Sequence, residues 1–341
     1  MDLACHHVDD RTLADGLDEG NGQGCARDLA ATSEQACSVR NDRLHRRNET
    51  REGNPMTETT QDRTPTQDPA EDGAFFPSPY SLSQYTAPTT DFDGLATEEQ
   101  YRGGRWKVLV IAAHERYMRM RNGTFFSTGN HPVETLLPLH HMAQAGYGID
   151  VATLTGGPGK LEWWAYPSQD EAVASTWEAA QESFKTPRAL ADVIADGLDD
   201  YAAIFIPGGH GAMTGLPDSR ELRSALDFFM EQDRLIITLC HGPAALLAAG
   251  IDREKNPFAG RRITAFPDSL DLGANIEIGY LPGQMPWNLG EQLTAAGFEI
   301  VNDDMSGATT RDGNLLTGDS PLAANQLGKE SALALLESFG D

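Results

Sequence analysis

The stretch Arg234-Leu-Ile-Ile-Thr-Leu-Cys240-His241-Gly242-Pro243-Ala-Ala-Leu-Leu decides the fold of this 341-residue chain. Its apolar run 235–239 is typical of a buried β-strand, and the run ends on a cysteine that leads directly into helix-forming residues. Gly242 and Pro243 suit a tight turn between the two, because proline is favoured at the first position of a helix. The stretch therefore predicts a nucleophile elbow, in which Cys240 projects from the carboxyl edge of a sheet.

This position predicts a reactive cysteine. The free N–H groups at the start of the next helix would favour the thiolate, which is the nucleophilic form. His241 follows directly, and neighbouring residues of a regular strand face opposite ways, so the two share a site only if the turn is strained. The alternative is a structural cysteine buried for packing alone.

Composition narrows the class of protein. An apolar content of 40% supports a sizeable core, and no apolar run is long enough to span a membrane. The formal charge of −25 argues against binding a nucleic-acid backbone or an anionic membrane. Four cysteines without metal-ligand or disulfide spacing, and the lack of an export signal, favour a reducing cytoplasm.

The N-terminal part divides into two segments. Residues 1–55 show no sustained period and predict a disordered leader, so that synthesis would start at Met56. Residues 56–105 are aromatic and turn-rich, which predicts an irregular arm or a short accessory element. A catalytic domain over 106–341 then follows.

From Trp106 onward strand and helix patterns alternate, which predicts an α/β fold with a parallel sheet flanked by helices. Helices are expected after Asn130, at 218–232, at 286–296 and at the C-terminus, with a hairpin turn at 311–314. Residues 158–188 are long for a link and predict an inserted helical cap over the site. The strands are predicted at residues 107–112, 149–154, 202–206, 235–239 and 262–265.

Three further groups could complete a cysteine site at the carboxyl edge of the sheet. Gly208 and Gly209 in the turn Pro207-Gly-Gly-His-Gly211 could form an oxyanion hole with the N–H of His241. Glu134, one turn into a helix, could shuttle protons or could simply complement the helix dipole. Asp268 and Asp271 are equal candidates to orient His241.

These motifs, together with Thr128-Gly-Asn-His-Pro-Val-Glu134 and Leu316-Thr-Gly-Asp-Ser-Pro, resemble the HchA branch of the class I glutamine amidotransferase-like superfamily. The resemblance runs from about Phe75 to the C-terminus. It implies a flavodoxin-like core with a smaller domain, and a homodimer. It assigns the nucleophile to Cys240 and the triad to His241 and Asp271, with Glu134 as the catalytic glutamate.

The resemblance implies glutathione-independent conversion of methylglyoxal or glyoxal to lactate or glycolate, and deglycation of proteins and nucleotides. Two alternatives stay open, namely a cysteine amidase or peptidase and a holding chaperone that binds unfolded proteins. Members of the branch can carry zinc, but here the ligand positions fall on Ala143, Gly148 and near Ala180. Because alanine and glycine side chains cannot coordinate zinc, we predict an enzyme without metal or other cofactor.

Overall fold

The run Leu235–Leu239 forms strand β9, as its apolar composition predicts. All five side chains are buried, because the strand lies inside a parallel sheet that is covered on both faces. The computed structural model describes residues 62–340. The predicted leader, with Cys5, Cys25 and Cys37, lies outside the described residues.

The central sheet has seven strands in the order β12-β13-β9-β8-β3-β6-β7. All neighbours are parallel except β12 and β13, which form the hairpin predicted at residues 311–314. Four of the predicted strands are confirmed to within one residue at each end. The remaining strands of the sheet are β12 (Thr309–Asp312), β13 (Leu315–Gly318), β8 (Tyr201–Ile206), β3 (Lys107–Ile111), β6 (Gly148–Thr153) and β7 (Arg188–Ala189).

The strand predicted over residues 262–265 is wrong in length and in place. Strand β10 covers only Arg262–Ile263 and pairs with β11 (Glu299–Ile300) in a separate two-stranded sheet. The next two residues bond to side chains instead of a strand: Thr264 N–H donates to Thr317 Oγ1, and Ala265 N–H to Asn302 Oδ1.

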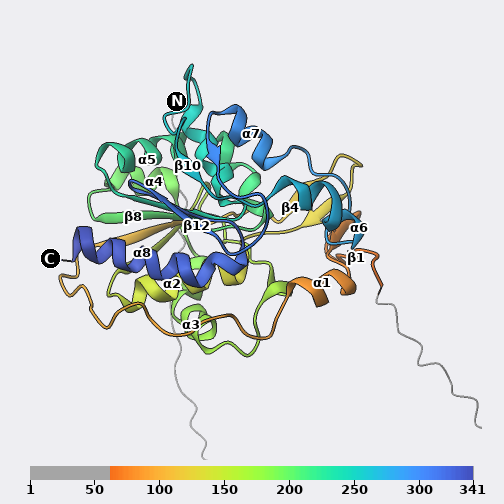
Figure 1. Ribbon diagram of the computed structural model, residues 1–341, viewed down its shortest axis with the longest axis horizontal. Coiled ribbons are helices and arrows are strands. Elements are labelled where there is room, and N and C mark those ends of the chain that lie inside the picture. Colours follow the sequence, from red (N-terminus) through yellow and green to blue (C-terminus); the bar gives the residue numbers. More distant parts are fainter. Residues whose placement is uncertain (1–61, 341) are drawn as a thin grey trace, which may run out of the picture. The chain divides into compact units, whose positions relative to one another are not determined.

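Helices cover both faces of the central sheet, which confirms the predicted α/β fold with a parallel sheet. In Figure 1, α2 (Pro132–Gln144), α3 (Glu171–Lys185) and α8 (Ala324–Phe339) lie on one side, and α4 (Leu190–Asp196) and α5 (Arg220–Glu231) on the other. The 3₁₀ helix η4 (Gly242–Gly250) follows β9 and packs against α5 and α7 (Leu289–Ala295). No helix within residues 62–340 is long and apolar enough to cross a membrane.

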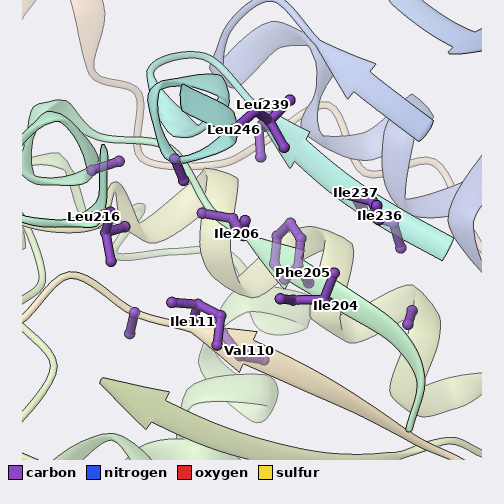
Figure 2. Close-up of a cluster of buried hydrophobic side chains, with 14 of the residues drawn as sticks. Val110, Ile111, Ile204, Phe205, Ile206, Leu216, Ile236, Ile237, Leu239 and Leu246 are labelled. Atoms are coloured by element: carbon purple, nitrogen blue, oxygen red, sulfur yellow. The ribbon is translucent and has the colours of Figure 1, made fainter. Parts of the chain in front are cut away.

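The core is built from the central strands. Each fully buried aliphatic or aromatic side chain there contributes about 1.5–3 kcal/mol relative to exposure. Figure 2 shows side chains of β3, β8 and β9 meeting Leu216 of η3 (Leu216–Asp218) and Leu246 of η4. The strand residues in this cluster are Val110, Ile111, Ile204, Phe205, Ile206, Ile236, Ile237 and Leu239. This core holds the end of β9 rigidly in place.

A small second sheet is built partly from the predicted N-terminal arm. Its order is β1-β2-β5-β4, with β1 (Thr66–Gln67), β2 (Ala74–Phe76), β5 (Phe125–Ser127) and β4 (Tyr117–Arg119). Strand β2 pairs in parallel with β5, and α1 (Pro79–Tyr85) follows it. The side chain of Ser78 caps α1 by accepting from Ser81 N–H.

The segment predicted as a cap over 158–188 has two parts, and only the first reaches the candidate site. Leu161 and the short helix η1 (Trp163–Ala165) lie beside the start of α2. Helix α3 instead packs against α2 and β6, as an ordinary layer of the fold. The prediction of a helical cap is therefore wrong for α3, whose moderately apolar face is buried against α2 rather than over the site.

Candidate active site

Cys240 lies at the turn directly after β9 and has the backbone conformation of a strained elbow. Its φ is +58°, a region that residues with a side chain rarely adopt. Two hydrogen bonds fix this geometry: Cys240 N–H donates to Gly318 O at 2.9 Å, and Phe266 N–H donates to Cys240 O at 2.9 Å. The predicted nucleophile elbow is confirmed in its backbone geometry.

Glycines make room for this turn. A Cβ on Gly242 would lie 2.6 Å from Ile206 O, and a Cβ on Gly208 would lie 2.7 Å from the Cβ of Cys240. No real Cβ tolerates such contacts, so both positions require glycine on steric grounds alone. The Gly208 turn and the Cys240 turn therefore pack directly against each other.

The elbow brings Cys240 and His241 into one site although they are adjacent in sequence. Cys240 Sγ lies 3.2 Å from His241 Nδ1, and His241 Nε2 lies 2.8 Å from Asp271 Oδ2. Asp268 is not part of this chain of contacts. It accepts hydrogen bonds from the N–H groups of Gly290 and Glu291, so it satisfies the start of α7.

A second histidine, which the sequence analysis missed, shares Asp271. His210 Nε2 lies 3.2 Å from Asp271 Oδ1, and its ring lies against that of His241 with 3.8 Å between centroids and a tilt of 33°. Asn275 Nδ2 also donates to Oδ1 of Asp271 at 2.7 Å. His210 lies in the motif Pro207-Gly-Gly-His-Gly211, of which the sequence analysis used only the glycines, as backbone N–H donors.

These contacts set the protonation states of the buried cluster. Burial opposes the charge on Asp271, but His210 and His241 outweigh it and hold the pKa of Asp271 well below its usual range. Burial and then the charge of His210 lower the pKa of His241 to about 4, against the opposing effect of Asp271. His241 is therefore neutral near pH 7. With Nε2–H donating to Asp271, its Nδ1 is free to accept a proton from Cys240.

Glu134, from the first turn of α2, is fully buried beside Cys240. Burial raises the pKa of Glu134 well above its usual range. Burial also raises the pKa of Cys240, and the charge of Glu134 adds to that shift, while the N–H of Gly209 opposes it. Burial thus opposes the resting thiolate that the N–H groups of the elbow were expected to favour.

A pocket of about 260 Å³ opens over Cys240. Glu134, His210 and His241 line it together with His131, whose pKa is lowered to about 3 by burial and by the other two histidines. Its other walls were not predicted from the sequence. They include Tyr85, Glu162, Trp164, Phe266, Asn275, Tyr280, Met305 and Leu322.

The positions that the resemblance implies for zinc do not carry suitable ligands. Ala143 and Ala180 line one cavity of about 290 Å³ between α2 and α3, in which His140 is the only lining residue of a type that zinc prefers. His140 Nδ1 bonds instead to Thr176 Oγ1, and His141 Nε2 bonds to Asn325 Oδ1. The donor set at this position therefore does not fit a zinc ion.

Comparison with known proteins decides the family. The sequence profile of the DJ-1/PfpI family matches residues 125–333, which is more than half of the chain. This chain belongs to the DJ-1/PfpI family. It is 58% identical over 278 residues to the protein/nucleic acid deglycase HchA of Staphylococcus aureus (strain bovine RF122 / ET3-1), covering 81% of this chain and 95% of that protein. The predicted resemblance to the HchA branch is confirmed.

Two solved structures agree with this chain on the fold. Glyoxalase III from Candida albicans is 22% identical with a TM-score of 0.54, covering 68% of this chain and 97% of that one. The Rapid Encystment Protein 24 kDa of Francisella tularensis is 20% identical with a TM-score of 0.58, covering 67% and 98%. At these identities the likeness concerns the fold alone.

Proposed function

We propose that this protein converts methylglyoxal and glyoxal to lactate and glycolate without glutathione, and removes the same dicarbonyls from glycated proteins and nucleotides. The observation that carries the proposal is the 3.2 Å contact between Cys240 Sγ and a neutral His241 beside the buried Glu134. The 58% identity to a protein/nucleic acid deglycase, over nearly its whole length, supports the same chemistry.

The first step forms a bond between sulfur and the aldehyde carbon. Cys240 Sγ attacks while its proton passes to Nδ1 of His241, and the aldehyde oxygen takes the proton of Glu134 to give a hemithioacetal. The raised pKa of Glu134 suits this role, because a carboxyl that is still protonated near neutral pH can act as a general acid. The N–H groups of Gly209 and His241, with the Gly208 turn behind them, are the candidate oxyanion hole.

The second step moves hydrogen between the two carbons. The Glu134 carboxylate removes the proton from the former aldehyde carbon while protonated His241 gives a proton to the ketone oxygen, and the product is an enediol. Glu134 then returns its proton to the neighbouring carbon while the hydroxyl on the former aldehyde carbon gives its proton to His241, which leaves a thioester on Cys240. Water then adds to the thioester carbonyl and gives a proton to the Glu134 carboxylate, and the thiol leaves with a proton from His241. The product is lactate, and both side chains regain their starting state. Asp271 is a positioning residue throughout, since it holds the tautomer of His241.

Deglycation uses the same steps on a dicarbonyl that is already attached to an amine, guanidine or thiol. We propose glycated proteins and nucleotides as these substrates and a homodimer in the cytoplasm as the working form. The formal charge of −25 disfavours approach to a long nucleic-acid backbone, so small adducts and proteins are the favoured substrates.

Lactate formation tests the proposal. Purified wild-type protein should produce lactate from methylglyoxal without added glutathione, and Cys240→Ala should produce none while it keeps the wild-type melting temperature. Wild-type protein that consumes no methylglyoxal but cleaves peptides would instead favour the cysteine peptidase. Holding-chaperone activity is separable, because Cys240→Ala should still suppress aggregation of an unfolded client if that activity is present.

A further inference from the structure

Glu162 is a second buried carboxyl in the candidate active site that the proposed reaction does not use. It lies just before η1 and has no exposed surface. Its N–H donates to Asn130 O at 3.0 Å, and its Oε1 accepts from Thr128 Oγ1 at 2.6 Å. These two bonds fix the position of the side chain from the strand-to-helix loop before α2.

The other oxygen, Oε2, is buried and has no hydrogen-bond partner of normal geometry among residues 62–340. The N–H of Gly129 lies near enough to the carboxyl to oppose the rise that burial causes in the pKa of Glu162. The nearby cation Arg116 does not supply one, because its Nη1 donates to the carbonyl oxygens of Thr128 and Leu161. Glu162 lines the pocket over Cys240, and so does Trp164, whose buried Nε1–H also lacks an acceptor within the described residues. Two adjacent walls of one pocket thus offer an unpaired acceptor and an unpaired donor.

A buried carboxylate with a purely structural role would have hydrogen-bond donors for both of its oxygens. Asp319, another fully buried carboxylate of this chain, shows what that looks like: it accepts from the N–H groups of Ser306, Gly307 and Ala308 and from Ser320 Oγ. A buried oxygen without a hydrogen-bond partner is unfavourable, and a ligand that donates to it removes that cost. The contrast between Asp319 and Glu162 indicates that Oε2 has its partner in the substrate.

Aromatic contacts place this wall next to the reacting groups. The ring of Trp164 meets Tyr280 edge-on at 5.6 Å between centroids, and Tyr280 lies 5.8 Å from His210. The ring of His210 in turn contacts that of His241, which contacts Cys240. These ring contacts connect Trp164 with Cys240 along one wall of the pocket.

We propose that Glu162 and Trp164 are substrate-binding residues that select compounds with a hydroxyl or N–H group next to a carbonyl. Glu162 Oε2 accepts from the hydroxyl or N–H, and Trp164 Nε1–H donates to the carbonyl oxygen. If the proposed function holds, the preferred substrate is the adduct of a dicarbonyl with an amine or thiol, because this adduct carries a hydroxyl beside its remaining carbonyl.

The test uses a readout that does not need turnover. Iodoacetamide alkylates Cys240, and lactamide, a neutral 2-hydroxy amide that cannot react, should slow that alkylation by occupying the pocket. Glu162→Gln and Trp164→Phe should each raise the lactamide concentration that gives half-protection by roughly tenfold or more, since each removes one buried hydrogen bond to the ligand. Glu178→Gln, on the exposed side of α3, is the matched control and should protect like wild type.

Lactamide that fails to protect the wild type, or protects both pocket variants as well as the wild type, would overturn the inference. Thermal melting of each variant shows whether it folds, and Trp164→Phe serves if Glu162→Gln does not. Lactate formation is measured on the same wild-type sample. Protein that shows protection dependent on Glu162 but forms no lactate would contradict the proposed reaction and still support this binding site.

Discussion

Replacing Gly208 by alanine tests the packing between the two turns of the candidate active site. A Cβ there would meet the carboxyl of Glu134 directly, and would lie 2.6 Å from Leu239 O and 2.7 Å from the Cβ of Cys240. The φ of Gly208 is not in the left-handed region, so alanine adds no backbone strain and the effect is steric. Neither Leu239 O nor the strained Cys240 can move away, because both belong to the end of a buried strand.

The expected cost follows from these contacts. Overpacking a filled interior costs typically about 1–3 kcal/mol, so we expect the free energy of unfolding of Gly208→Ala to fall by that amount. The carboxyl of Glu134 is the softest neighbour, and its displacement by about 1 Å should lower turnover by roughly 100-fold. Turnover should thus suffer more than stability.

Urea unfolding and lactate formation measure the two effects. The matched control is Gly273→Ala, because a Cβ at Gly273 would have no atom within 4 Å and the backbone there is helical. This control should keep wild-type turnover and lose no stability. Wild-type stability together with wild-type turnover in Gly208→Ala would refute the packing of the site described above.

Three further predictions concern charge and metal. Glu134→Gln should gain stability relative to wild type as pH rises from about 5 to 9. The raised pKa of Glu134 gives wild type a contribution to the free energy of unfolding that is full below about pH 4.3 and is lost as pH approaches the pKa in the folded state. A difference in urea midpoint between the two proteins that does not change with pH would contradict this. Asp268→Ala should lower the free energy of unfolding by about 0.5–2 kcal/mol, because the start of α7 loses its acceptor, with little change in turnover. Asp271→Asn should lower turnover by at least roughly 100-fold. Equal effects of the two variants on turnover would contradict the choice of Asp271 as the partner of His241. EDTA should leave lactate formation unchanged, given Ala143 and Ala180 at the implied zinc positions, and activity that falls with EDTA and returns with zinc would overturn the metal-free prediction.

The sequence predicted the parts of the fold that depend on long apolar runs. The central strands were found because each is nearly continuous in apolar residues, and the elbow was found because Cys240 falls where such a run meets Gly242 and Pro243. Short elements were not found. Strands of two or three residues, such as Thr66–Gln67, carry no period, and their pairing depends on distant partners.

The sequence predicted site residues that belong to local motifs, and it did not predict those that reach the site only through packing of distant segments. Asp268 and Asp271 are three residues apart beside an irregular helical turn, η5 (Leu270–Ala274), so spacing alone could not decide between them. His210 and Glu162 reach the site from the starts of two separate 3₁₀ helices, which only the assembled fold brings together. The effect of burial on Cys240, which opposes the local dipole, could not be predicted because the sequence does not give burial.

In the proposed reaction Cys240 and Glu134 act together on a dicarbonyl, which the fate of methylglyoxal in D₂O tests. Wild-type protein, without glutathione, should form lactate with some deuterium at carbon 2, because the Glu134 carboxyl exchanges its proton with solvent between removing and returning it. Glu134→Gln should form lactate roughly 100- to 10,000-fold more slowly while remaining folded. Lactate formed by Glu134→Gln at close to the wild-type rate, without deuterium at carbon 2 in either protein, would show that Glu134 does not carry the proton between the two carbons.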